Sequence, residues 1–228
     1  MSDDETERVR ERYARRSMQY DPMSRWVYMS RQELERALIG VLASELRPPV
    51  SATRVLEIGC GSGSNLLQFL RLGFRPDLLV GIELLEDRVR AARHVLPESL
   101  VIHHGDALAT TLPSEGFDIV FQSLVFSSIL SAEFRARLAA RMWRLVKVGG
   151  GVLWYDFIYD NPANADVKGV PIDEVRRLFP GGKVKFCRLT LAPPISRRVV
   201  ALSPGLYSLF NALPFLRTHV LCWIGKTS

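Results

Sequence analysis

Short apolar runs alternate with helical patterns along most of the chain. Five runs have the length and composition of buried strands, and they cover residues 54–58, 78–83, 100–104, 117–123 and 152–157. Helical patterns between them lie at residues 65–70, 86–96 and 131–146. Strands that alternate with helices in this way are typical of an α/β fold with a mostly parallel sheet and helices on both faces.

The flanks extend this pattern. Residues 8–47 have a helical composition, and a second helix is expected from Arg31 with Ser30 as its candidate N-cap. An apolar insertion punctuated by prolines occupies residues 192–218. Three further elements surround it, a helix at 172–179 and strands at 183–191 and 219–225.

Composition sets the broad class. A chain of 228 residues, 47% of them hydrophobic, suits one domain with a full core. Its three cysteines are far apart and lack a nearby histidine cluster, so neither a disulfide framework nor a metal site is expected. The N-terminus is acidic, and no apolar run approaches the roughly 18 to 20 residues of a membrane span. These features predict a soluble, cytoplasmic protein.

The net charge of +6 is concentrated in the last quarter of the chain. From Val175 to Ser228 there are nine basic residues and no Asp or Glu. Such a region meets an anionic substrate, an anionic membrane or nucleic acid, or it is an ordinary solvated surface. The insertion at 192–218 is apolar and has arginines near both ends. Three interpretations of it stay open: a cap over an apolar pocket, a peripheral membrane contact, or an extra helix packed on the sheet.

A glycine turn follows the first strand. Gly59, Gly61 and Gly63 separate this strand from a helix that begins near Asn65. Glycines at such a turn let the backbone approach a ligand closely, and the helix N-terminus directs free N–H groups at it, so the turn predicts a nucleoside-cofactor site. The NAD fingerprint would need its third small residue at Ser64, where glycine is absent, so an NAD-dependent reductase is a poor match.

Further residues connect this turn to a known family. Glu57 inside the first strand, the glycine turn and Glu83 at the end of the second strand together resemble motifs I and II of the class I S-adenosylmethionine-dependent methyltransferases. The Gly-Asp-Ala sequence at 105–107 is similar to motif III, and the Phe-Asp pair at 117–118 to the start of motif IV. The stretch at 145–150, whose glycines are expected to close a helix before the fifth strand, resembles the small-molecule type, such as the quinone-biosynthetic methyltransferase group.

The resemblance implies a Rossmann-like, seven-stranded, mostly parallel sheet whose last strand is antiparallel. It implies S-adenosylmethionine as cofactor, with S-adenosylhomocysteine as its product. It also divides the chain into an N-terminal helical lid at 1–50, a cofactor-binding core at 51–160, and a C-terminal part of the same domain at 161–228.

Several residues acquire expected roles toward the cofactor. Glu83 lies at the carboxyl end of its strand, where a carboxylate can accept hydrogen bonds from both ribose hydroxyls. By resemblance, Asp106 takes the adenine amino group, the backbone N–H of Ala107 meets a ring nitrogen, and Leu84 lies against the adenine. Gln122 is expected beside the methionine part. The complete expected set is Glu57, Gly59, Cys60, Gly61, Gly63, Glu83, Leu84, Asp106, Ala107 and Gln122.

The acceptor is expected to be a small molecule that is apolar, lipid-like or anionic. In the resembled family, the segment before motif I folds over the cofactor and the substrate pocket, which makes four residues candidate lid contacts: Tyr20, Arg25, Trp26 and Arg31. The methyl donor is already activated, so a strong base is not required; a hydroxyl acceptor would benefit from one. The candidate bases are Tyr155, Asp156 and His104.

Alternative functions follow from the same fold. The sequence Gln122-Ser123-Leu124-Val125 has neither the Asn/Asp-Pro-Pro-Tyr/Phe motif of adenine methyltransferases of DNA nor the Pro-Cys of cytosine C5 enzymes. An RNA methyltransferase using the basic C-terminal face is one alternative, and a binding protein that retains the fold without transfer is another. Nucleic acid is not the expected partner, since no separate RNA-binding module is recognisable. The oligomeric state is left open.

Overall fold

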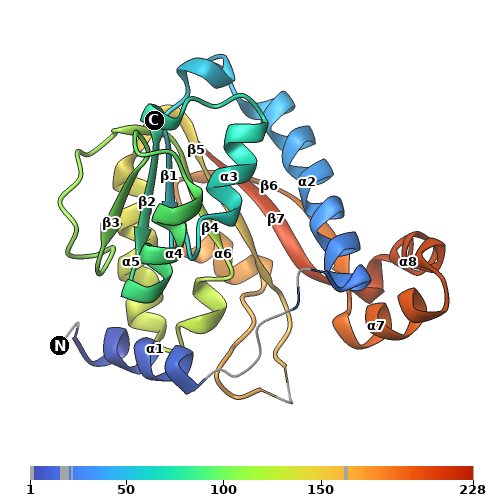
Figure 1. Cartoon of the computed structure of the whole chain (residues 1–228). Coiled ribbons are helices and arrows are strands. Elements are labelled where there is room, and N and C mark those ends of the chain that lie inside the picture. Colours follow the sequence, from blue (N-terminus) through green and yellow to red (C-terminus); the bar gives the residue numbers. More distant parts are fainter. Residues whose placement is uncertain (1–2, 16–20, 22, 162–163, 228) are drawn as a thin grey trace.

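The computed structural model describes residues 3–15, 21, 23–161 and 164–227, and its centre is one seven-stranded sheet (Figure 1). The strands are β1 (Val55–Ile58), β2 (Leu79–Glu83), β3 (Val101–His104), β4 (Phe117–Ser123), β5 (Val146–Phe157), β6 (Gly182–Leu191) and β7 (Arg217–Lys226). The α-helices are α1 (Asp3–Arg15), α2 (Arg25–Glu45), α3 (Ser64–Arg71), α4 (Glu86–Val95), α5 (Ala132–Leu145), α6 (Ile172–Leu178), α7 (Pro193–Leu202) and α8 (Pro204–Asn211). The predicted α/β class is confirmed.

The strand order is β3-β2-β1-β4-β5-β7-β6, so the chain reverses its direction of travel across the sheet between β1 and β4. Both neighbours of β1 run parallel to it. In such sheets, ligands bind beyond the carboxyl ends of the strands at this reversal point. The glycine turn leaves β1 at this edge, which we call the carboxyl edge of the sheet.

The last strand is antiparallel, as expected from the resemblance. β7 inserts between β5 and β6 and runs antiparallel to both. Since β5 and β6 therefore run in the same direction, the carboxyl end of β6 also lies at the carboxyl edge. The segment at 192–218 starts there.

β5 differs from expectation at its start. It begins at Val146, whereas the sequence predicted that residues 147–151 only close the preceding helix. The pairing of β4 with β5 shifts register between Phe117 and Ile119, and Gly149 has a φ of +85°. This irregularity allows the glycines to continue the strand.

Helices cover both faces of the sheet. Buried residues of α5 and α6 pack on one face, and those of α2, α3 and α4 pack on the other. α2 begins at Arg25, so the expected cap at Ser30 is wrong: the Ser30 hydroxyl donates to the carbonyl of Trp26 within the helix. Leu34 and Leu38 join the core beside β5 and β7. α2 is thus a core helix, and the expected lid at 1–50 stays a prediction.

A separate cluster joins α7 and α8 to the first half of α2, and Figure 1 shows this pair of helices projecting from the body. Its buried members are Leu191, Val199, Val200 and Tyr207. No helix within the described residues has both the length and the apolar content needed to cross a bilayer.

Candidate functional site

The three glycines of the turn have different surroundings. All have positive φ values, +68° at Gly59, +56° at Gly61 and +85° at Gly63, which favour glycine. A Cβ on Gly59 would lie 2.6 Å from Val125, and one on Gly63 would lie 2.6 Å from Leu96. A Cβ on Gly61 would meet no atom within 4 Å. Gly59 and Gly63 are therefore required by packing, whereas Gly61 borders open space that a ligand can enter.

Glu57 is a buried carboxylate with spare acceptor capacity. Its Oε1 accepts a hydrogen bond of 2.6 Å from Asn65 Nδ2, but its Oε2 has no partner among the described residues. Burial raises the pKa of Glu57 to about 8 despite the Asn65 hydrogen bond, and the charge of Glu83 adds to this effect. A cationic, N–H-bearing group bound here would satisfy the vacant oxygen and favour the ionised carboxylate.

Glu83 links the end of β2 to the glycine turn. Its Oε2 accepts from the backbone N–H of Gly61 at 2.7 Å, and its Oε1 accepts from that of Leu85 at 2.9 Å. These bonds orient the carboxylate, and each oxygen retains a second lone pair for a ligand hydroxyl. Cys60 is buried in the same turn and packs under β2, since a Cβ on Gly81 would lie 2.7 Å from its sulfur. The thiol of Cys60 therefore serves packing.

Asp106 follows β3 and connects this edge to the N-terminal helix. Its Oδ1 accepts from the backbone N–H of Leu108 at 2.8 Å, and its Oδ2 accepts from the hydroxyl of Thr6 in α1 at 3.0 Å. Ala107, the adjacent expected contact, is partly buried. An adenine amino group that binds Asp106 would meet a carboxylate already in contact with α1.

A cavity of about 460 Å³ lies between α1 and the carboxyl ends of β2 and β3. Its volume is within the range of small-molecule sites. The expected adenine contact Leu84 and the candidate base His104 both line it. The full lining is Glu7, Arg10, Glu11, Ala14, Leu84, Leu85, Glu86 and His104.

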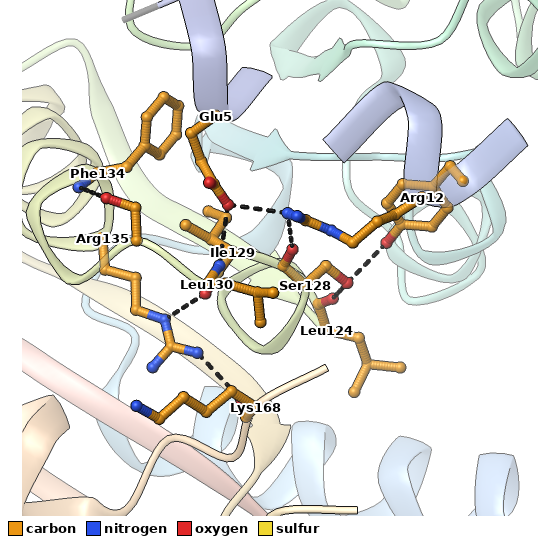
Figure 2. Close-up of polar contacts among 11 residues, drawn as sticks. Glu5, Arg12, Leu124, Ser128, Ile129, Leu130, Phe134, Arg135 and Lys168 are labelled. Atoms are coloured by element: carbon orange, nitrogen blue, oxygen red, sulfur yellow. Dashed lines mark hydrogen bonds and ion pairs between the residues drawn. The ribbon is translucent and has the colours of Figure 1, made fainter. Parts of the chain in front are cut away.

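A buried ion pair fixes α1 over the loop that follows β4 (Figure 2). Arg12 donates to the Glu5 carboxylate at 2.8 Å and to the carbonyl of Ser128 at 2.9 Å, and Glu5 also accepts from the backbone N–H of Leu130 at 2.9 Å. Below this loop, Arg135 donates to the carbonyl of Ile129 at 2.7 Å. α1 thus covers the carboxyl edge through specific polar contacts.

Two candidate bases on β5 are engaged within the protein. Tyr155 is buried, and its hydroxyl lies 2.8 Å from that of Thr190; burial raises the pKa of the phenol. Asp156 is fully buried, accepts from the backbone N–H groups of Ser127 and Phe157, and has its pKa raised to about 6 by burial. His104 is exposed at the cavity described above, as the last residue of edge strand β3. The three candidates do not share one location.

The remaining expected contacts are scattered. Gln122 is fully buried, its Oε1 accepts from the backbone N–H of Val125, and its Nε2 donates to the carbonyl of Tyr155. Among the lid candidates, Trp26 packs with α7 and α8 beneath the guanidinium of Arg197, which lies 4.8 Å from its ring. The other three are two exposed residues of α2, Arg25 and Arg31, and Tyr20, which lies outside the described residues.

Sequence reasoning missed three residues at this site. Asn65 binds Glu57, Thr6 binds Asp106, and Glu5 anchors α1. Asn65 had a local signal, because it lies in the first turn of the helix after the glycines. Thr6 and Glu5 had none, since their partners are 100 or more residues away along the chain.

The described residues contain no group of three or more His, Cys, Asp or Glu side chains arranged to hold a metal ion. The polar groups at the carboxyl edge are instead carboxylates and backbone N–H groups, which suit an organic ligand with hydroxyl, amino and cationic groups.

Comparison with known proteins bears directly on this edge of the sheet. Residues 55–150 match the protein family described as "Methyltransferase domain". Indolepyruvate C-methyltransferase of Streptomyces griseus is 32% identical over 109 residues, which make up 45% of this chain and 31% of that protein. Malonyl-[acyl-carrier protein] O-methyltransferase of Bacteroides fragilis (strain 638R) is 35% identical over 82 residues, 36% of this chain and 16% of that protein. The chain thus spans less than a third of either relative's length.

A solved structure supports the fold. The crystal structure of a SAM dependent methyltransferase from Archaeoglobus fulgidus is similar with a TM-score of 0.60 and 17% sequence identity. The similarity covers 84% of this chain and 94% of that one. At this identity the likeness establishes the architecture of the sheet and its helices.

Proposed function

Because the chain belongs to the class I S-adenosylmethionine-dependent methyltransferase superfamily, we propose that it transfers the methyl group of this cofactor to a small acceptor that is apolar, lipid-like or anionic. The observation that carries the proposal is the vacant Oε2 of Glu57 beside the open face of Gly61. A buried carboxylate oxygen without a hydrogen-bond partner is unfavourable, and the cofactor's ammonium group would supply the missing donor.

Glu57, Gly61 and Glu83 would hold the cofactor at three points. Glu57 binds the ammonium of the methionine part, Gly61 lets the backbone approach, and Glu83 accepts from the ribose hydroxyls. Asp106 and Ala107 then bind the adenine, with Leu84 along its face. When bound, the cofactor supplies an activated methyl group on a sulfonium. Transfer of that methyl group would leave S-adenosylhomocysteine as the product.

The contribution of the protein is alignment and the exclusion of water. Orientation of donor and acceptor can account for roughly 7 to 11 kcal/mol of a barrier at best. The polar docking of α1 through Glu5 and Arg12 supports a role for this helix as the cover of the cofactor. Tyr155 and Asp156 are engaged in internal hydrogen bonds, which leaves the exposed His104 as the remaining candidate base for an acceptor that needs one.

The acceptor class rests on the surface near the carboxyl edge. The insertion at 192–218 is apolar and lies in the basic last quarter of the chain. The two curated relatives are named for transfer to carbon and to oxygen, so they leave the accepting atom open.

Calorimetric titration with S-adenosylhomocysteine tests the cofactor site. We expect Glu83→Ala and Asp106→Ala each to weaken binding by about 10-fold to 100-fold, since each removes hydrogen bonds to the ligand. Asp77→Ala is the matched control, because Asp77 is an exposed carboxylate paired with Arg75 away from this edge. Unchanged affinity in both site variants would remove the assignment.

Methyl transfer itself is tested with labelled S-adenosylmethionine and a panel of small acids and lipids. Labelled product in the wild-type reaction that is absent with Glu83→Ala supports an enzyme. Tight cofactor binding without transfer to any acceptor would instead favour a binding protein that retains the fold.

A further inference from the structure

The helices α7 and α8, with the 3₁₀ turn at Pro214–Leu216, expose large apolar side chains on the side away from their buried cluster. Leu202 is 82% exposed, Leu209 66% and Phe215 70%. With Leu213, these residues form what we call the hairpin tip. A helix pair that buries one apolar side and also exposes several large apolar side chains marks an interaction surface.

Hydrogen bonds attach the pair of helices α7 and α8, which we call the hairpin, to the rest of the protein. The exposed side chains therefore belong to an ordered element. The carboxylate of Glu33 in α2 accepts from the hydroxyl of Tyr207 at 2.6 Å and from Asn211 Nδ2 at 2.7 Å. Arg217 closes the far end by donating to the carbonyl of Asn211 at 2.7 Å. The exposed side chains therefore lie on a scaffold attached to the core helix α2.

Positive charge surrounds the tip. Arg197 and Arg198 are exposed on α7, and neither forms a salt bridge with any residue that the structure describes. Arg25 and Arg31 are exposed on α2, whose contacts with α7 and α8 place it beside the hairpin. From Val175 onward the chain contributes no carboxylate side chain.

We propose that the hairpin tip docks on an anionic membrane surface. Its leucines and phenylalanine enter the boundary between headgroups and acyl chains, and the arginines on the flanking helices bind lipid phosphates. Protruding apolar side chains flanked by exposed arginines suit an anionic bilayer. A second copy of the chain is disfavoured as the occupant, because it would bring like charges together.

The topology places the hairpin tip at the same edge of the sheet as the cofactor site, four strands away from β1. The hairpin leaves the carboxyl end of β6, which lies at the same edge of the sheet as the carboxyl ends of β1 and β4. Docking would hold that edge near the lipid surface. The docking itself does not depend on methyl transfer, so it can be tested independently of the proposed function.

Flotation of the full chain with lipid vesicles tests the proposal. We expect binding to vesicles that contain phosphatidylglycerol and phosphatidylcholine, little binding to phosphatidylcholine alone, and weaker binding at high salt. The double substitution Leu209→Ser and Phe215→Ser should reduce binding at least about tenfold. Arg198→Glu should reduce it at least about fivefold. The matched controls are Arg137→Glu on α5 and Val95→Ser on α4, both exposed elsewhere, which should bind like wild type.

Three results would overturn the proposal. They are the absence of vesicle binding, equal binding to neutral and anionic vesicles, and a dimer in sedimentation equilibrium that the double substitution dissociates, which would assign the tip to a second copy. Affinity for S-adenosylhomocysteine should be unchanged in the double variant. If cofactor binding fails in all proteins while vesicle binding persists, the proposed function fails and the dock stands.

Discussion

Two glutamates show how the same side chain serves two purposes. Glu33 lies in the half of the molecule with α7 and α8, and Glu57 lies in the half with the glycine turn. Glu33, in α2, accepts hydrogen bonds from the backbone of Thr190, the hydroxyl of Tyr207 and the amide of Asn211. Glu57, in β1, accepts only from Asn65 and keeps one buried oxygen vacant. The carboxylate of Glu33, which has several hydrogen-bond donors, joins helices to the sheet. The carboxylate of Glu57, which has one oxygen without a donor, is available to a ligand.

The difference follows from the hydrogen-bond donors that surround each carboxylate. Around Glu33, donors come from α8 and β6, so burial is compensated inside the protein. Around Glu57, the next element is a glycine-rich turn from which no side chain donates to the Glu57 carboxylate among the described residues, and Gly61 leaves open space. Stability and function should therefore separate between the two halves when each is mutated.

Filling the open face of the turn should have the largest effect. A valine side chain at Gly61 would occupy the space through which the cofactor approaches the protein backbone. Gly61→Val should therefore weaken S-adenosylhomocysteine binding at least about 1000-fold, or about 4 kcal/mol, in calorimetric titration. Gly73→Val is the control, because Gly73 also has a positive φ, +92°, but lies in the loop after α3. Equal loss in both variants would mean that backbone strain alone is responsible.

Removal of the Glu33 carboxylate should lower the stability of the protein and leave cofactor binding unchanged. Glu33→Ala leaves three donors without their acceptor, and we expect the free energy of unfolding in urea to fall by about 2 to 3 kcal/mol. Cofactor affinity should stay within twofold of wild type. Glu35→Ala, which removes only a contact of 3.6 Å with exposed Arg71, should cost less than about 1 kcal/mol. A marked loss of affinity in Glu33→Ala would show that the two halves are coupled.

The sequence predicted much of the half with the glycine turn and little of the half with α7 and α8, for a physical reason. The strands, the glycine turn and Glu83 are local patterns, in which the residue types and their spacing are sufficient. The bond from Tyr207 to Glu33 joins residues 174 apart, and that from Thr6 to Asp106 joins residues 100 apart. No local pattern encodes such pairs, and the same limit explains why Trp26, expected in a lid, packs under Arg197 on the hairpin instead.

The vacant carboxylate should make cofactor binding depend on pH. In the free protein, Glu57 holds its proton up to a pKa of about 8, because burial disfavours the charged form. The ligand ammonium favours the ionised form, so binding at pH 7 should release a proton, and affinity should rise by up to about tenfold per pH unit from pH 6 before levelling near pH 8. Titration with S-adenosylhomocysteine in buffers of different ionisation enthalpy measures this release. Glu57→Gln should abolish it, and proton release that persists in this variant would assign the effect to another group.

The smallest effect should come from the contact between α1 and the site. The hydroxyl of Thr6 donates to Oδ2 of Asp106, the residue whose carboxylate is expected to meet the adenine amino group, so the two donors would share that carboxylate. Thr6→Val keeps the shape of the side chain and removes the donor, and we expect S-adenosylhomocysteine to bind about threefold more tightly, or about 0.6 kcal/mol, because the carboxylate can accept from both donors and only their sharing is relieved. Thr6→Ser retains the hydroxyl and should match wild type. Weaker binding in Thr6→Val would mean that the hydroxyl contacts the cofactor, and α1 would then belong to the binding site.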